Sequence, residues 1–124
     1  MTDRTFSVDE ARALIPDVRK RTAEIIRIRA DLAELAHDLR LGRSAEGGSG
    51  IPEAKAYEAR LDELVSWFGE IGIEVRGLAP VLVDFPAVLD GEDVQLCWLE
   101  GEPALAWYHR PDLGFVGRRP LPEP

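Results

Sequence analysis

The sequence is organised around the stretch Val94–His109, VQLCWLEGEPALAWYH. Two apolar runs meet at Glu100–Pro103, EGEP, and a glycine suits the first central position of a two-residue type II′ turn. The stretch therefore predicts a β-hairpin. It also holds two of the three tryptophans, the only cysteine and one of the two histidines, so we expect a functional site, if one exists, to lie on this hairpin.

The position of the turn determines which side chains share a face of the hairpin, because side chains alternate along a strand. With Gly101 and Glu102 at the turn, one face is bulky and the other carries mainly small residues. The bulky face comprises Val94, Leu96, Trp98, Leu105, Trp107 and His109, and the other comprises Gln95, Cys97, Leu99, Ala104, Ala106 and Tyr108. Small side chains allow a helix to approach closely, so we expect the helices on the Cys97 face. The tryptophan face then needs another cover.

Length and charge restrict the class of protein. A chain of 124 residues fits a single domain, and one cysteine excludes an internal disulfide and a zinc site built from several cysteines. The start, MTDRTFSVDE, lacks the apolar region of a signal peptide, and no apolar run is long enough to span a membrane. We therefore expect a cytoplasmic protein. The net charge of −8 argues against a nucleic-acid partner. Acidic neighbours interleave with the one basic concentration, Arg19–Arg21 with Arg27 and Arg29, which we interpret as a solvated helix face.

The first half of the chain predicts a long antiparallel helical hairpin over residues 7–71. Ser7 and Glu10 form a capping box, so a helix begins at Val8, and Pro16 should kink or break it. Apolar residues then recur every seven positions at Val18, Ile25, Leu32 and Leu39, with Thr22, Arg29 and Ala36 between them. This spacing resembles a coiled coil with polar interruptions. A flexible connector over residues 42–52 precedes a second helix at about residues 53–71.

The second half predicts a small sheet. Residues 73–76 and 81–86 read as strands, Pro86 ends the second of them, and Asp90-Gly91 marks a turn before the hairpin. The fold we expect is α+β: the helical hairpin packed on a mostly antiparallel sheet of three or four strands. We interpret residues 1–124 as one domain, with the β region at 73–109 and a tail at 110–124.

The sequence contains none of the common nucleotide-binding, metalloprotease or serine-hydrolase motifs. A loose set of polar residues lies near the hairpin: Asp84, Glu102, His109, Asp112 and Arg118. Asp84 lies in an apolar strand and is either buried against Arg118 or Arg119 or exposed at an edge. His109 is either a metal ligand or acid–base group, or a structural histidine. Because Cys97 and His109 fall on opposite faces, they should not share a metal, and we expect no metal and no cofactor.

Two functions remain open. The first is a non-catalytic interaction or assembly protein that uses the helical hairpin and the tryptophan face of Leu96, Trp98, Leu105 and Trp107. The second is an enzyme that binds a small ligand or a metal near Asp84, Glu102, His109 and Arg118. An uncovered tryptophan face would expose a large apolar patch, so we expect a homodimer, and the hairpin could bind another protein. The tail is the alternative cover for that face.

Several blocks of the sequence resemble a known family. These are FSVDEARALIP near the start, then GIEVRGL, LVDFPA and GEDVQLCWLEGEP, and finally His109 followed by GFVGRRPL. Together they are similar to DUF2203, a family of small prokaryotic proteins, over essentially the whole chain. The resemblance implies a bacterial or archaeal cytoplasmic protein of unassigned role. It supplies no catalytic residues.

Overall fold

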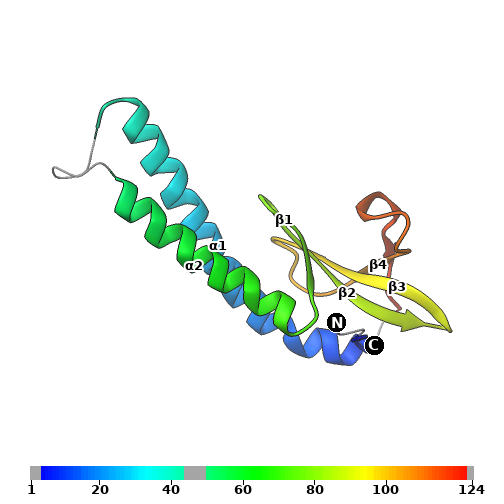
Figure 1. The fold of residues 1–124 in the computed structure, drawn as a ribbon. Coiled ribbons are helices and arrows are strands. Elements are labelled where there is room, and N and C mark those ends of the chain that lie inside the picture. Colours follow the sequence, from blue (N-terminus) through cyan, green and yellow to red (C-terminus); the bar gives the residue numbers. More distant parts are fainter. Residues whose placement is uncertain (1–3, 44–49, 123–124) are drawn as a thin grey trace.

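Two long helices and a five-stranded sheet make up the described residues, 4–43 and 50–122, of the computed structural model (Figure 1). The helices are α1 (Val8–Arg40) and α2 (Ile51–Glu70), and the strands are β1 (Glu74–Leu78), β2 (Val81–Leu89), β3 (Glu92–Leu99), β4 (Trp107–His109) and β5 (Arg119–Pro120). The strand order is β1-β2-β3-β4-β5, and every neighbouring pair is antiparallel. The predicted α+β class is confirmed. The sheet has five strands rather than three or four, because the tail supplies the two residues of β5.

The predicted start of α1 is confirmed by its cap. The Ser7 hydroxyl accepts a hydrogen bond from the Glu10 backbone N–H, and the Glu10 carboxylate accepts one from the Ser7 N–H. The helix continues through Pro16, so the predicted break does not occur. Proline removes a single helical hydrogen bond, and the packing of α1 on the sheet outweighs that loss. The helix ends at Arg40, and Gly42 follows with φ at 73°.

The two helices lie side by side, and their far ends project beyond the sheet (Figure 1). We call this part, residues 32–43 and 50–54, the distal arm. Burial decreases along α1 towards it, from Val18 at 0% exposed to Leu39 at 38%. The middle of the predicted connector, residues 44–49, falls outside the described residues. Neither helix, over its described residues, is long and apolar enough to cross a membrane.

The helices cover the opposite face of the sheet from the one that the sequence indicated. Phe85 and Leu96 are register partners, as are Val83 and Trp98, and all four are buried in one cluster with helix residues such as Ile25. The tryptophan face is therefore the core face, and placing the helices on the Cys97 face was wrong. Burial of large apolar side chains stabilises the fold more than a close approach to small ones.

The predicted pairing of the hairpin is wrong by one residue. Cys97 pairs with Trp107 and Gln95 with His109, whereas the expected turn placed Leu96 opposite Trp107. Residues 102–106 are not in a strand, so β4 begins only at Trp107. A shift of one residue turns every side chain of a strand to the other face. Trp107 and His109 consequently lie on the Cys97 face, away from the helices.

Strand β2 runs three residues past Pro86, where the sequence suggested that it ended. The carbonyl group of Pro86 accepts a hydrogen bond from the Phe6 N–H at 2.7 Å, so this edge of Pro86 faces the N-terminal segment rather than β3. The missing N–H of proline therefore costs no bond in the β2–β3 ladder. The predicted turn at Asp90-Gly91 is confirmed, because both residues have positive φ, 51° and 80°.

The tail covers part of the second face of the sheet. The Arg118 guanidinium lies 4.9 Å from the Trp107 ring centroid and 4.7 Å from that of Phe115. Its Nη2 also donates to both carboxylate oxygens of Glu102 at 2.7 Å. The tail thus covers the part of the second face around Trp107, whereas Val88 of β2 on the same face is 49% exposed. Leu96, Trp98 and Leu105, proposed as an interaction face, are 0–2% exposed and unavailable to a partner.

Candidate functional site

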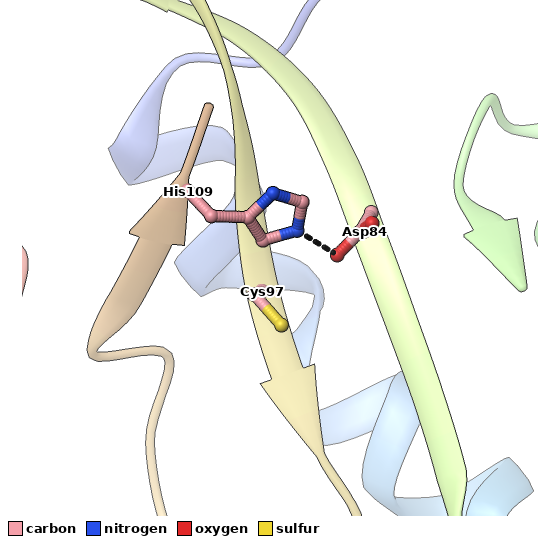
Figure 2. Close-up of side chains that lie close together, drawn as sticks. All are labelled: Asp84, Cys97 and His109. Atoms are coloured by element: carbon pink, nitrogen blue, oxygen red, sulfur yellow. Dashed lines mark hydrogen bonds and ion pairs between the residues drawn. The ribbon is translucent and has the colours of Figure 1, made fainter. Parts of the chain in front are cut away.

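Three buried polar side chains meet on the face of the sheet that the helices do not cover. Asp84 of β2 and Cys97 of β3 are register partners, and His109 of β4 lies one strand further along (Figure 2). Their exposed fractions are 3%, 0% and 3%. Figure 2 shows the three side chains pointing into the same space from three adjacent strands. We call them the Asp84–Cys97–His109 cluster.

The imidazole of His109 is held by hydrogen bonds on both nitrogens. Nδ1 lies 2.8 Å from the backbone carbonyl oxygen of Arg110, and Nε2 lies 3.1 Å from Asp84 Oδ1. A carbonyl oxygen only accepts, so the contact at Nδ1 needs a hydrogen on that nitrogen. Carboxylate oxygens also only accept, so the contact between Nε2 and Asp84 needs a second hydrogen, on the ring or on the carboxyl group. The other carboxylate oxygen, Oδ2, accepts a hydrogen bond from Arg76 Nε at 3.1 Å.

The thiol of Cys97 is kept in its neutral form. Burial, followed by the negative charge of Asp84, raises the pKa of Cys97 from 9.0 to about 12, and Arg118 opposes this shift. A neutral buried thiol is a poor nucleophile, because the thiolate is the reactive species. The cluster is thus not arranged as a cysteine–histidine catalytic pair, in which the histidine activates the thiol. The thiol faces the carboxylate instead.

The cluster has the composition of a metal site, and its spacing is slightly wider than that around a bound zinc ion. One ligand atom from each of its three residues can be chosen so that all lie within 4.8 Å of one another. Tetrahedral zinc with bonds of about 2.0–2.3 Å holds its ligands roughly 3.3–3.8 Å apart, so a contraction of about 1 Å would close the site. A histidine that binds a metal commonly donates its other N–H to a carbonyl group, as Nδ1 of His109 does here.

Residues 4–121 match the family of uncharacterised conserved proteins named DUF2203. The chain belongs to this family. No curated protein and no solved structure gives a significant match. The matched region of this DUF2203 protein extends from the segment before α1 to the end of the sheet, and it includes the whole Asp84–Cys97–His109 cluster.

Two of the three cluster residues in this DUF2203 protein, Asp84 and His109, are predicted as site residues by the sequence. The expected pair of Asp84 with Arg118 or Arg119 is wrong, because the partners of Asp84 are His109 and Arg76. Arg118 pairs with Glu102, and both residues lie close enough to Cys97 to act on its charge.

Asp112 is not part of the cluster. It pairs with Arg110 at 2.9 Å, and both side chains are more than half exposed. Two residues of the site were not identified from the sequence, namely Cys97 and Arg76. The expectation that Cys97 and His109 lie on opposite faces is wrong, because the one-residue shift of β4 places them on one face, with ligand atoms within 4.8 Å of each other. Glu74 is the register partner of Asp84 on the neighbouring strand, and Arg76 lies two residues further along on the same side of β1. This alternation was the signal in the sequence that Arg76 could reach Asp84.

Proposed function

We propose that this DUF2203 protein binds a divalent metal ion of the zinc class through Asp84, Cys97 and His109. The observation that carries the proposal is the convergence of a carboxylate, a thiol and an imidazole within 4.8 Å in a buried site. Such a site favours a dication on grounds of charge. The thiolate and the carboxylate together neutralise it, and a buried charge is tolerated only when it is compensated.

The ligand set also favours one class of metal. Thiolate and imidazole ligands suit zinc and related transition metals, whereas magnesium and calcium prefer oxygen ligands alone. Arg76 would keep its hydrogen bond to Oδ2 and leave Oδ1 for the ion. Three protein ligands leave one position for water or a substrate atom, as in catalytic zinc sites. The protein would then be a metal-dependent enzyme, with Glu102 and Arg118 as polar residues beside the metal.

The proposal is tested by metal content and by cobalt substitution in the full-length protein. We expect about one zinc ion per chain after purification with added Zn²⁺, and no retention of Mg²⁺. Co²⁺ should give a thiolate-to-metal charge-transfer band that disappears in Cys97→Ser. Each of Asp84→Asn, Cys97→Ser and His109→Gln should weaken zinc binding by at least about tenfold, since loss of even an outer partner costs that much.

The matched control is His37→Gln, which removes the other histidine of the chain, an exposed residue of α1. This variant should bind zinc as tightly as the unaltered protein. Equal binding by Cys97→Ser and the unaltered protein would contradict the proposed ligand set. Failure of the unaltered protein to bind zinc at micromolar concentration would contradict the function itself.

A second candidate, assembly through the distal arm, is supported by the exposed apolar side chains near its tip. Leu39, Leu41 and Ile51 are 38%, 51% and 57% exposed on a projection beyond the sheet. Exposed apolar clusters favour self-association or a protein partner. The covered tryptophan face no longer supplies a dimer surface, so the proposed homodimer would form through this arm.

Sedimentation at micromolar concentration tests the arm. We expect a dimer for the unaltered protein and a monomer for Leu41→Glu. Val116→Glu is the control, because Val116 is 93% exposed and lies in the tail. A mass of 13.8 kDa for the unaltered protein would rule out the homodimer.

A further inference from the structure

A groove lies between the first half of α1 and the loop that precedes β4, on the helix side of the sheet. Its volume is about 640 Å³, within the range of small-molecule sites. Ile15 and Leu105, 6% and 1% exposed, contribute its apolar surface together with Pro16 and Pro103. The groove is separate from the Asp84–Cys97–His109 cluster, which occupies the other face of the sheet.

Three cationic side chains line this groove, and none of its lining residues is acidic. Arg12, Arg19 and Lys20 lie eight residues or fewer apart on α1, at spacings that place them on one side of a helix. Arg12 is fixed across the groove by a hydrogen bond from its Nε to the Leu105 carbonyl oxygen at 3.3 Å.

No carboxylate forms an ion pair with these side chains within the described part of the chain. Glu100 and Glu102 line a neighbouring hollow with Arg19, and Glu24 and Glu63 line one with Lys20, so acidic residues lie beside the groove but not in it. The side chains of Arg19 and Lys20 form no hydrogen bond or ion pair with another residue there, and Arg12 forms no ion pair. In contrast, Arg29, Arg60 and Arg118 each contact a carboxylate. In a chain with a net charge of −8, a groove with three cations and no acid is a local reversal of sign. This reversal favours an anionic ligand.

We propose that the groove binds a small organic anion with an apolar body. A carboxylate or phosphate group would pair with the guanidinium groups, which match its geometry, while the apolar body packs on Ile15, Pro16 and Leu105. A nucleic-acid backbone is a poor fit, because it needs an extended basic surface and the rest of this chain is acidic. The sequence predicts that Arg19 and Lys20 lie on a solvated helix face, and only the fold brings them opposite Pro103 and Leu105.

The probe for this groove is 1-anilinonaphthalene-8-sulfonate, and the comparison is N-phenyl-1-naphthylamine, which has the same rings without the sulfonate. In fluorescence titrations of the full-length protein, we expect one saturable site for the anionic probe and weaker binding of the neutral one. Added salt should weaken the anionic probe only. The variant Arg19→Gln/Lys20→Gln should lose at least about fivefold in affinity, because it removes two of the three cations.

The matched control is Arg27→Gln/Arg40→Gln, which removes the same charge from exposed positions of α1 outside the groove. This control should remain within about twofold of the unaltered protein, since exposed charges at a distance contribute little. Equal losses in both double variants would show a general charge effect and overturn the proposal. So would equal affinity for the two probes, or no binding of the anionic probe.

A second measurement locates the bound probe without any substitution. In ¹H–¹⁵N spectra of the unaltered protein, the anionic probe should shift the amide signals of residues 12–20 and 104–105. Shifts confined to the distal arm would overturn the proposal, because the probe would then bind the exposed leucines there. Zinc binding is not involved in either measurement, so the outcome is independent of the proposed metal site.

Discussion

Cys97 combines complete burial with a raised pKa, and these properties determine its reactivity. From the sequence we expect Cys97 to be buried against a helix; the burial is confirmed, but Cys97 lies on the face that the helices do not cover. With a pKa of about 12 the thiol stays protonated at neutral pH. We expect metal-free protein to react with a thiol reagent only through opening of the fold. Rapid and complete labelling of the folded protein at pH 7 would contradict this placement.

The same pKa has a consequence for stability at alkaline pH. The thiol ionises at pH 9.0 in the unfolded chain but only near 12 in the folded protein, so the folded state binds the extra proton between these values. The free energy of unfolding should therefore fall by up to about 1.4 kcal/mol per pH unit across this window. Urea unfolding at pH 8 and pH 10 measures the effect. Cys97→Ser removes this contribution, and an equally steep fall in that variant would contradict it.

Asp84 is the residue whose replacement should destabilise the metal-free fold most. Its carboxylate is 4% exposed and holds both His109 and Arg76. Breaking one side of a buried pair costs roughly 3–5 kcal/mol, so Asp84→Asn should lower the free energy of unfolding by that order. The control is Asp112→Asn, an exposed ion-pair carboxylate whose removal should cost at most about 1 kcal/mol. Similar losses in the two variants would show that the Asp84 pair is not structural.

At the scale of elements, one arginine joins the first helix to the sheet. Arg29 donates to both carboxylate oxygens of Glu100 at 2.8 and 3.0 Å and to the Leu78 carbonyl oxygen at 2.7 Å. Glu100 also accepts from the Val81 N–H at 2.9 Å. The polar interruption that the sequence shows at position 29 of the helical stripe is thus the contact between α1 and two turns of the sheet.

Removal of this contact should be measurable. Arg29→Gln leaves Glu100 without its charged partner, and we expect a loss of about 1.5–3 kcal/mol in the free energy of unfolding. The hydrogen bonds from Arg29 lower the pKa of Glu100 below its ordinary value of 4.5. The stabilisation by this pair should therefore be lost as the pH falls below 4.5 and through the lowered pKa of the folded state. Arg60→Gln, which breaks the exposed pair with Glu24, is the control and should cost at most about 1 kcal/mol.

The elements themselves could be predicted from the sequence where local chemistry determines them. The capping box at Ser7 and the Asp90-Gly91 turn each depend on neighbouring residues only. The pairing of β4 does not. It depends on an irregular loop over residues 102–106, and the turn at Gly101 did not reveal how many of those residues leave the ladder. The predicted register places Cys97 and His109 on opposite faces of the hairpin, whereas the observed register, one residue different, places them on the same face.

At the scale of the whole molecule, the two faces of the sheet have different covers. Helices pack on one, and the tail, through Arg118, packs on the other. Arg118→Gln should loosen the second cover and increase the labelling rate of Cys97. Arg119→Gln is the control, because Arg119 is exposed and adjacent in sequence. Equal labelling rates in both variants would show that Arg118 does not protect the thiol.

The contacts of α1 also determine when this helix can complete its packing during synthesis. The helix is complete by residue 40, yet its hydrogen-bond partners come much later in the chain: Arg29 binds Glu100, and Arg12 binds the Leu105 carbonyl group. Phe6, just before the helix, likewise contacts Pro86 and Ala87, which are made about 80 residues later. During translation, the apolar stripe of α1 leaves the ribosome long before the strands that bury it. The helix α2 is complete by residue 70 and can pack against α1 first, so the stripe of α1 that faces the sheet is the part that stays exposed until the strands follow.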